Sequence, residues 1–404
     1  MYDEFNVLGI CTLVVSFYIF FLIYKNKLIG SFISVGWLGL FVYSLPVYIN
    51  YSRNIFYTGN EVSYLINPPL EAKFVYFLFW IGFLFSLFFI KKNDGLILAK
   101  KKVNQKIFNI FEIICEINVT MYLIYYIFFE IQNSFLLLLG RWLLLFIVII
   151  YAIREKFFKT FLIFIIIITY SFYVPDRTLI VISFFSVFSI LVYRNKHKYF
   201  QKINITYLVS FLSFGIIVLF NKFIFNIFFG EDTLSLNNIF LTLYKLPKSF
   251  EPFIIFAHTT FSLNINNFDS IKYLESIFSN LFIFPSFFEL NNNYYYETLI
   301  KNLSLELSYG IGGSIFASSY LGFGFSGLIL MGFLFGYTII SLDKYIKSSN
   351  SLLIILASAV AAFIATYIFR NSLDNFFSFI RQIIIVYVFL YFQFYIFINI
   401  KKKY

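Results

Sequence analysis

Residues 320–341 read YLGFGFSGLILMGFLFGYTIIS, a stretch without a single Asp, Glu, Lys or Arg. A helix needs about 20 mostly apolar residues to cross the hydrocarbon core of a bilayer, so this stretch is long enough to span a membrane. Gly332 and Gly336 are four residues apart and share one helical face, which favours close packing on a neighbouring helix. We therefore expect a membrane-spanning helix that packs tightly on another.

The rest of the chain has the same apolar character. Of its 404 residues, 60% are hydrophobic, 24% are aromatic and only 13% are charged, whereas about a quarter of the residues in a soluble domain are charged. A soluble protein of this size needs a polar surface that this sequence does not supply. The composition therefore excludes a water-soluble globule.

Ten further apolar stretches follow one another almost end to end, and we interpret each as a membrane-spanning helix. The eleven predicted spans are residues 5–24, 28–49, 71–90, 108–129, 134–152, 157–174, 178–193, 203–220, 320–341, 351–369 and 376–400. The predicted fold is an all-α polytopic membrane protein. Residues 1–220 hold spans one to eight, residues 221–319 form a large outer loop with short amphipathic helices, and residues 320–404 hold the last three spans.

The net charge of +11 is better explained by membrane topology than by nucleic-acid binding. Twenty of the 31 lysines and arginines fall in alternate gaps between the spans or at the C-terminal end. Because basic loops stay on the cytoplasmic side, this distribution places the N-terminus outside and the C-terminus inside. The first residues, Met1 to Glu4, contain no basic residue, so we expect span one to be retained rather than cleaved.

The outer loop contains segments with helical spacing of apolar residues. Residues 234–246 and 271–284 have this pattern, and we expect them to form helices that lie on the membrane surface. Pro252 fits the first turn of another short helix, which runs to about Ser262. On that helix Glu251 and His258 are seven residues apart and share a face.

Several kinds of chemistry find no support in the sequence. Gly322, Gly324 and Gly327 match the dinucleotide-binding pattern Gly-x-Gly-x-x-Gly, but no strand precedes them. There is no phosphate-loop lysine and no Asp-x-Asp pair, and Cys11 and Cys115 both lie in apolar runs. We expect no metal, no cofactor and no disulfide framework.

Three arginines lie near the predicted outer surface: Arg177, Arg370 and Arg381. Arginine in a membrane segment is costly and indicates a function or a specific partner. If residues 370–381 form one helix, then Arg370, Asp374 and Arg381 make a stripe that could hold an anion, with Asp374 as the partner of Arg381. The alternative is an Arg370–Asp374 pair that fixes the top of the helix, while Arg381 extends to water.

Glu112 and Glu116 are one turn apart in the fourth span. Such a pair could form a proton or cation relay, which would favour a transporter. The two carboxylates lie close to the predicted inner end of the span, where lysine-rich segments could neutralise them. Both interpretations remain open from the sequence.

Three short motifs resemble those of the bacterial O-antigen and capsule repeat-unit polymerases, the Wzy family. The glycine-rich segment from Leu307 to Gly327 resembles the end of the family's large outer loop. Asp176-Arg177-Thr178 resembles its arginine at the top of a central span. The segment from Phe369 to Asp374, FRNSLD, resembles its arginine-and-aspartate turn before the last span. The chain departs from the family at Ser318 and Ser319, where members often have an acidic residue.

The resemblance implies a multi-pass enzyme of the bacterial inner membrane. With the orientation expected from the charge distribution, its N-terminus would be periplasmic and its C-terminus cytoplasmic. It would join undecaprenyl-diphosphate-linked oligosaccharide repeat units into O-antigen or capsular polysaccharide on the periplasmic face. The implied partners are the lipid-linked oligosaccharide, membrane lipid and a chain-length regulator protein.

The candidate residues suit this reaction. An acceptor hydroxyl attacks the anomeric carbon while a lipid diphosphate leaves, so the site needs cations and a base. Arginine pairs with phosphate oxygens at two points, and we predict that Arg177, Arg370 and Arg381 bind the diphosphate. The candidate bases are His258 or Glu251, with Asp374 third. Residues 291–296 of the outer loop could present amides and rings to sugars.

Two other functions fit the same layout. An O-antigen ligase has a similar arrangement, often with a histidine in the loop, and His258 keeps this alternative open. A flippase or other carrier of the lipid-linked repeat would have charged residues along several spans, usually in paired halves. In this chain the charged residues that are candidates for a site gather toward the outer face, which favours the polymerase.

Overall fold

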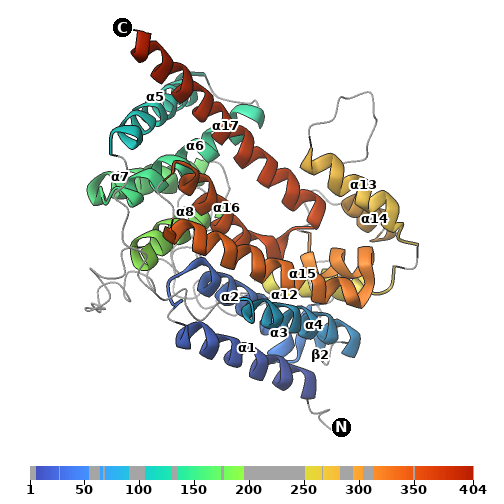
Figure 1. The fold of residues 1–404 in the computed structure, drawn as a ribbon. Coiled ribbons are helices and arrows are strands. Elements are labelled where there is room, and N and C mark those ends of the chain that lie inside the picture. The colour runs from blue at the N-terminus through green and yellow to red at the C-terminus, as the bar shows by residue number, and fades with distance from the viewer. Residues whose placement is uncertain are drawn as a thin grey trace, which may run out of the picture.

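The computed structural model describes residues 6–26, 28–53, 64–66, 69–90, 105–129, 134–173, 177–194, 251–265, 267–282, 294–303, 313–348 and 351–403. These residues are almost all helical, as predicted (Figure 1). The exception is a short antiparallel pair of strands, β1 (Tyr51–Arg53) and β2 (Tyr64–Ile66), in which Ser52 is opposite Leu65.

The helical elements follow the chain in this order: α1 (Val7–Lys25), α2 (Phe32–Tyr43), α3 (Leu45–Tyr48), α4 (Leu70–Leu87), α5 (Gln105–Phe129), α6 (Ser134–Ile153), α7 (Phe157–Tyr173), α8 (Arg177–Ser189), the π-helical turn η1 (Ile190–Arg194), α12 (Glu251–Ser262), α13 (Ser270–Leu281), α14 (Tyr294–Leu303), α15 (Ile315–Ser348), α16 (Leu353–Tyr367), the 3-10 turn η3 (Ile368–Arg370) and α17 (Leu373–Lys403).

Six of these helices are long and apolar enough to cross a membrane: α1, α4, α5, α15, α16 and α17. Four shorter apolar helices, in α2, α6, α7 and α8, coincide with further predicted spans. The remaining predicted span, 203–220, lies outside the described residues. The architecture is that of a helical membrane protein, and the total of eleven spans stays a prediction.

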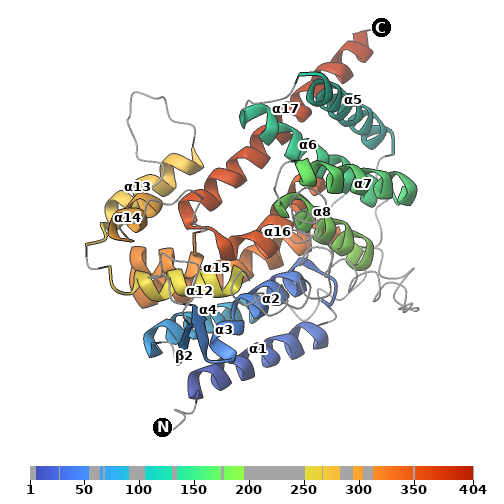
Figure 2. The ribbon, with the colours of Figure 1, turned by 180° about the vertical axis from the view of Figure 1, so that it is seen from behind.

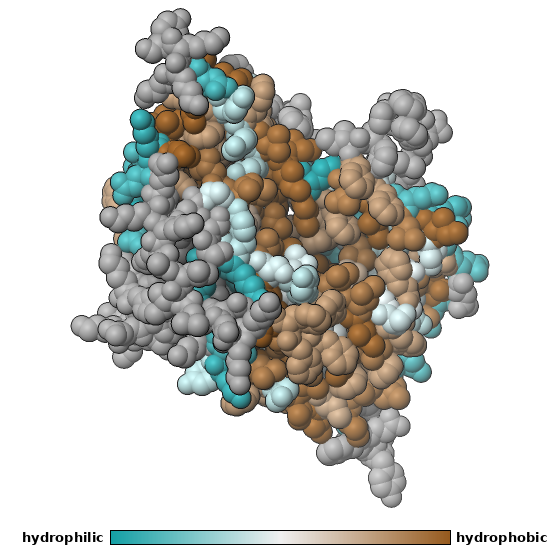
Figure 3. All heavy atoms as spheres, viewed as in Figure 1, coloured by the Kyte–Doolittle hydropathy of each residue, from teal (hydrophilic) through white to brown (hydrophobic). Residues whose placement is uncertain are grey.

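The outer surface is rich in large apolar side chains. On α1, Val14 is 62% exposed and Phe21 is 53% exposed, and on α17 Val388 is 56% exposed. Apolar side chains cover much of the face seen in Figure 3. Because a contiguous apolar surface of this extent is unfavourable in water, it supports lipid as the surrounding solvent.

The helix α15 lies near the centre of the arrangement (Figures 1 and 2). It packs along α4, with α1 on the far side of α4, and it also contacts α2 and α16. Beyond α16 lie α8 and then α6 and α7. The long helix α17 begins beside α13 and contacts α6 and α5 farther along.

Glycines allow α4 and α15 to pack backbone to backbone, as the sequence predicted. A Cβ atom on Gly332 would lie 2.2 Å from the carbonyl oxygen of Phe79, and one on Gly82 would lie 2.1 Å from that of Ile329. On the same face, a Cβ on Gly336 would lie 2.0 Å from the Ser86 Oγ. Any larger side chain at these positions would push the two helices apart.

The helix α15 changes direction at Gly324, whose φ of 66° and ψ of −161° are not helical. This backbone conformation suits glycine because it lacks a Cβ. Gly322, two residues before, lies against α13, since a Cβ there would be 2.7 Å from the Tyr273 ring. The glycine-rich segment therefore serves helix packing and a bend in the chain.

Two of the predicted outer helices are present. The helix expected from Pro252 to Ser262 is α12, which begins at Glu251. The helix expected in residues 271–284 is α13, capped by the Asp269 side chain, which accepts hydrogen bonds from the backbone N–H groups of Ile271 and Lys272. The helix expected in residues 234–246 lies outside the described residues.

We predict that Gly332→Val destabilises the protein. The added side chain meets the α4 backbone, and overpacking of this kind costs about 1–3 kcal/mol. The measurement is thermal unfolding in detergent, in which labelling of the buried Cys115 thiol reports the fraction of unfolded protein. The matched control is Leu330→Val on the exposed side of the same helix, where the native side chain is 55% exposed. Equal unfolding midpoints for the two variants would contradict the close packing of α4 and α15.

Candidate functional site

Two of the predicted site residues, Glu251 and Arg370, form an ion pair. The Arg370 Nε lies 2.8 Å from the Glu251 Oε1, and the two side chains are 34% and 35% exposed. Glu251 is the first residue of α12 and Arg370 the last residue of η3. The pair thus joins the outer-loop region to the turn before the last helix, and it is accessible to a ligand.

Two tyrosines lie beside this pair. The Arg370 guanidinium lies over the Tyr367 ring, 4.9 Å from its centroid, which is a cation–π contact. The Tyr43 hydroxyl, from the end of α2, lies beside the Glu251 carboxylate. Each charged group therefore has an aromatic neighbour in addition to its partner in the ion pair.

The predicted stripe of Arg370, Asp374 and Arg381 on one helix is wrong. Asn371 has extended backbone angles, with φ −119° and ψ 149°, so the helical path stops after Arg370. The helix α17 starts anew at Leu373, after Ser372. The alternative Arg370–Asp374 pair is also wrong, because Arg370 pairs with Glu251.

Asp374 instead attaches α13 to the start of α17. Its side chain is buried and accepts a hydrogen bond of 3.2 Å from the Ser276 Oγ and one of 3.0 Å from the backbone N–H of Asn375. Nearby, the Tyr273 hydroxyl accepts a 3.2 Å hydrogen bond from the Leu373 backbone N–H. The Asp374 carboxylate is therefore placed to position α13, not to meet a substrate at the surface.

Burial raises the pKa of the Tyr295 phenol above its ordinary value. This phenol therefore stays neutral in the protein interior.

Arg381 binds backbone carbonyls instead of the expected Asp374. Its Nη1 donates hydrogen bonds to the carbonyl oxygens of Ser279, at 3.0 Å, and Phe282, at 3.1 Å. Ser279 is in the last turn of α13 and Phe282 is the residue that follows the helix, so the guanidinium lies at the C-terminal end, where the helix dipole favours a positive charge. Among the described residues Arg381 makes no ion pair. A diphosphate would therefore have to compete with these backbone carbonyls for the Arg381 guanidinium.

His258 and Tyr295 are both buried. His258 is 6% exposed and lies on α12, a helix that packs against α2, α4 and α15. Tyr295 is 1% exposed, so its ring is not offered to a sugar. Residues 291–293, which were expected to contact sugars with it, lie outside the described residues.

Arg177 was expected at the end of a span, and it is the first residue of α8. Its side chain and the preceding Asp176 lie outside the described residues. Its predicted role in binding a diphosphate therefore stays a prediction.

Two of the segments that carry the family resemblance meet in space. A Cβ on Gly313 would lie 2.2 Å from the backbone nitrogen of Ser372, so the two backbones are in contact. Gly313 belongs to the glycine-rich segment, and Ser372 belongs to the arginine-and-aspartate turn. The contact brings the chain before α15 against the turn that carries Arg370.

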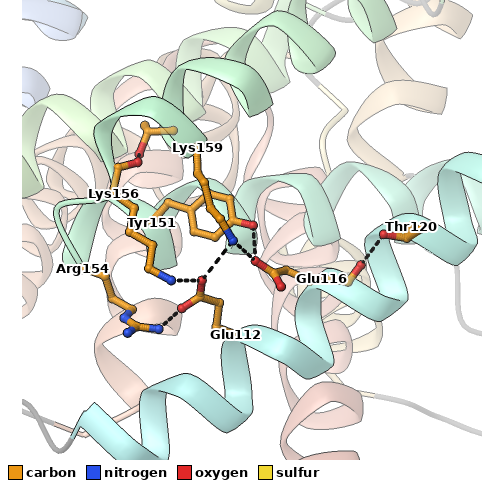
Figure 4. Close-up of polar contacts among 8 residues, drawn as sticks. Glu112, Glu116, Thr120, Tyr151, Arg154, Lys156 and Lys159 are labelled. Carbon is orange, nitrogen blue, oxygen red and sulfur yellow. Dashed lines mark hydrogen bonds and ion pairs between the residues drawn. The ribbon is translucent and has the colours of Figure 1, made fainter.

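A second group of charges surrounds Glu112 on α5 (Figure 4). The buried Glu112 carboxylate pairs with Arg154 and Lys156, which lie between α6 and α7, and its Oε1 is 3.8 Å from the Lys159 Nζ. Burial lowers the pKa of both Arg154 and Lys156. These contacts tie α5 to the connection between α6 and α7.

Glu116 is held in the same group. Its Oε1 lies 2.7 Å from the Lys159 Nζ and accepts a 2.6 Å hydrogen bond from the Tyr151 hydroxyl (Figure 4). Basic residues thus neutralise both carboxylates, which is one of the two interpretations that the sequence left open. The arrangement gives no support to a relay along α5.

Comparison with known proteins adds no family assignment. No protein-family model matches the chain, and neither a curated protein nor a solved structure matches it. Function is therefore argued from the motifs and from the geometry of the site.

The partner of Asp374 on α13 was not predicted from the sequence. A signal was present, because Tyr273, Ser276 and Asn280 are polar residues at helical spacing. They form a face opposite the apolar residues of the same helix. Such a polar face indicates a polar partner, and the nearest candidates in an apolar chain are charged residues of a neighbouring helix.

We predict that Glu112→Gln destabilises the protein more than Glu116→Gln does. Glu112 is 3% exposed and Glu116 is 33% exposed, so removal of the buried charge leaves Arg154 and Lys156 without their acceptor. A buried group that loses its partner costs about 1–3 kcal/mol, and more if it is charged. The measurement is the thermal midpoint of both variants in detergent. A larger decrease of the thermal midpoint in Glu116→Gln would contradict the central place of Glu112 in this group of charges.

Proposed function

We propose that the chain is a membrane glycosyltransferase that polymerises undecaprenyl-diphosphate-linked oligosaccharide repeat units into O-antigen or capsular polysaccharide. The observation that carries this proposal is the accessible Arg370–Glu251 ion pair, in which a cation and a carboxylate lie 2.8 Å apart. The pair lies beside the place where Gly313 meets Ser372, that is, where two of the resembling segments touch.

The proposed reaction uses both members of the pair. The oxygen of an acceptor hydroxyl attacks the anomeric carbon of the donor sugar, and the bond from that carbon to the diphosphate oxygen breaks. Arg370 binds the departing diphosphate, since guanidinium pairs with phosphate oxygens and stays charged. Glu251 takes the proton of the acceptor hydroxyl.

The ground-state contact between the two residues has a purpose in this scheme. A diphosphate carries more negative charge than one carboxylate and competes with Glu251 for the guanidinium. When the donor binds, Arg370 turns toward it and the Glu251 carboxylate loses its partner. A carboxylate without its cation is a better proton acceptor, because a nearby positive charge favours the ionised form. Donor binding would therefore activate the base.

Exposure favours Glu251 over the other candidate bases. Glu251 is 35% exposed, whereas His258 and Asp374 are 6% and 1% exposed. A base must come within hydrogen-bond reach of the acceptor hydroxyl. In this scheme His258 and Asp374 position α12 and α13, and Arg177 is the candidate for a second contact to the diphosphate.

We predict that Arg370→Ala and Glu251→Gln each abolish polymer. Loss of a group that stabilises developing charge lowers the rate about 100- to 1,000-fold, and loss of a general base about 100- to 10,000-fold. Arg177→Ala is expected to have the same effect as Arg370→Ala. The measurement is the glycan ladder from cells that contain equal amounts of each variant in the membrane. The control is Lys272→Ala, an exposed charge on α13 that should leave the ladder intact. Full-length glycan from both arginine variants would refute the proposal.

A deletion strain separates the proposed function from its alternatives. We predict that it accumulates single repeat units on the cell surface, because export and ligation proceed without polymerisation. Free polymer on the carrier lipid would instead indicate a ligase. Repeat units trapped on the inner leaflet would indicate a flippase. Electrophoresis of surface glycan, together with extraction of carrier lipid, distinguishes the three outcomes.

A further inference from the structure

The helix α13 has its polar side toward the protein and its apolar side outward. The buried side includes Tyr273, Ser276 and Asn280, which lie against α17 and its surroundings. The outward side carries four large apolar residues with exposures of 70%, 37%, 53% and 51%: Ile271, Leu274, Phe278 and Phe282. This is the reverse of a surface helix in a soluble protein, whose apolar stripe faces the core.

The helix runs beside the first turns of α17 and in the same direction (Figures 1 and 2). Contacts between the two helices advance together along both chains: Tyr273 with Leu373, Ser276 with Asp374, and Ser279 with Arg381. Residues Leu373–Ile400 of α17 form a candidate membrane span. A helix that follows the start of a crossing helix must itself descend toward the bilayer.

The end of α13 is suited to an apolar solvent. The last carbonyls of a helix lack partners within it, and in lipid no water can satisfy them. Here the Arg381 guanidinium donates to the carbonyl oxygens of Ser279 and Phe282. A positively charged side chain on the candidate span α17 thus binds one carbonyl in the last turn of α13 and the carbonyl of the residue after it, at the end where the helix dipole is negative.

Charged residues of this segment are confined to its beginning. Asp269 caps the helix, and Lys272 and Glu275 lie in its first half. From Ser276 to Phe282 there is no charged side chain. This distribution fits a helix whose first turns lie at the polar interface and whose last turns lie deeper.

We propose that α13 is a half-membrane helix, which enters the lipid beside the first turns of α17 and ends there. Its outward stripe, Ile271, Leu274, Phe278 and Phe282, contacts the acyl chains of the bilayer. The sequence led us to expect that this segment forms a helix lying flat on the membrane surface. Because α13 runs along α17, we infer instead that it descends into the bilayer. The inference is independent of the proposed enzymatic function.

The exposed surface of α17 supports the proposal that acyl chains cover the apolar stripe of α13. Beyond its contacts with α13, the helix continues with the exposed apolar residues Ile384, Ile385 and Val388. These belong to a candidate span, so lipid is the solvent expected around them. The α13 stripe adds apolar surface at the start of the same span.

Spin labelling of the full-length protein in liposomes tests the proposal. Cys11 and Cys115 are replaced by alanine, and a single nitroxide is placed in turn at 271, 274, 278 and 282, all of which are exposed. Collision rates with oxygen and with a water-soluble nickel complex then give the depth of each label. A label at 388 marks the lipid-facing part of α17.

The expected result is a depth that increases steadily from position 271 to position 282. The increase is at most about 16 Å, the length of 11 helical residues, and smaller if the helix is tilted. Equal shallow depths would show a flat helix and overturn the proposal. High nickel access at all four positions would show an aqueous loop, and low access to both reagents would show a protein partner; either result overturns it.

Arg381→Met provides a second test. Without the guanidinium, the last carbonyls of α13 need water, so the end of the helix moves to the interface. We expect nickel access at position 282 to rise while access at 388 stays unchanged. An unchanged depth at 282 would contradict the role assigned to Arg381.

Discussion

In a helical protein this apolar, a charged group among the helices needs a partner within the protein, and these partnerships determine how the helices are arranged. Asp343, on α15, accepts hydrogen bonds of 3.0 Å from the first N–H groups of α2, those of Phe32 and Ile33. Asp374 and Arg381 attach α13 to α17, and Glu112 attaches α5 to the connection between α6 and α7. Because an unpaired charge is costly in lipid, each of these contacts specifies one arrangement of its helices.

The Arg370–Glu251 pair differs from these contacts in its exposure. Each of its side chains is about one-third exposed, whereas Asp343 and Asp374 are 2% and 1% exposed. Buried charges hold helices together, while an accessible pair can exchange its internal partner for a ligand. The need of each charged side chain for a partner thus explains both the contacts that hold the helices together and the ion pair of the candidate site. The aromatic contact from Tyr367 keeps the guanidinium oriented for that exchange.

Features that depend on local spacing were predictable from the sequence. Pro252 marked the first turn of α12, and Gly332 and Gly336 marked the contact with α4. The break at Asn371 had a local signal that was overlooked, since Asn and Ser favour helix caps over helix interiors. The pairing of Arg370 with Glu251 had no local signal. It joins residues far apart in the chain, and only the packing of α12 beside η3 brings them together. The Arg381 contacts were equally hidden, because its partners are backbone carbonyls.

The most direct test of the central claim is polymerisation by the purified protein in liposomes that contain a defined undecaprenyl-diphosphate-linked repeat unit. If the chain is the proposed polymerase, products lengthen by whole repeat units and one equivalent of undecaprenyl diphosphate is released for each linkage formed. This release stops when Arg370 is replaced by alanine. Unchanged substrate with the intact protein, or equal release from the Arg370→Ala variant, would contradict the proposal.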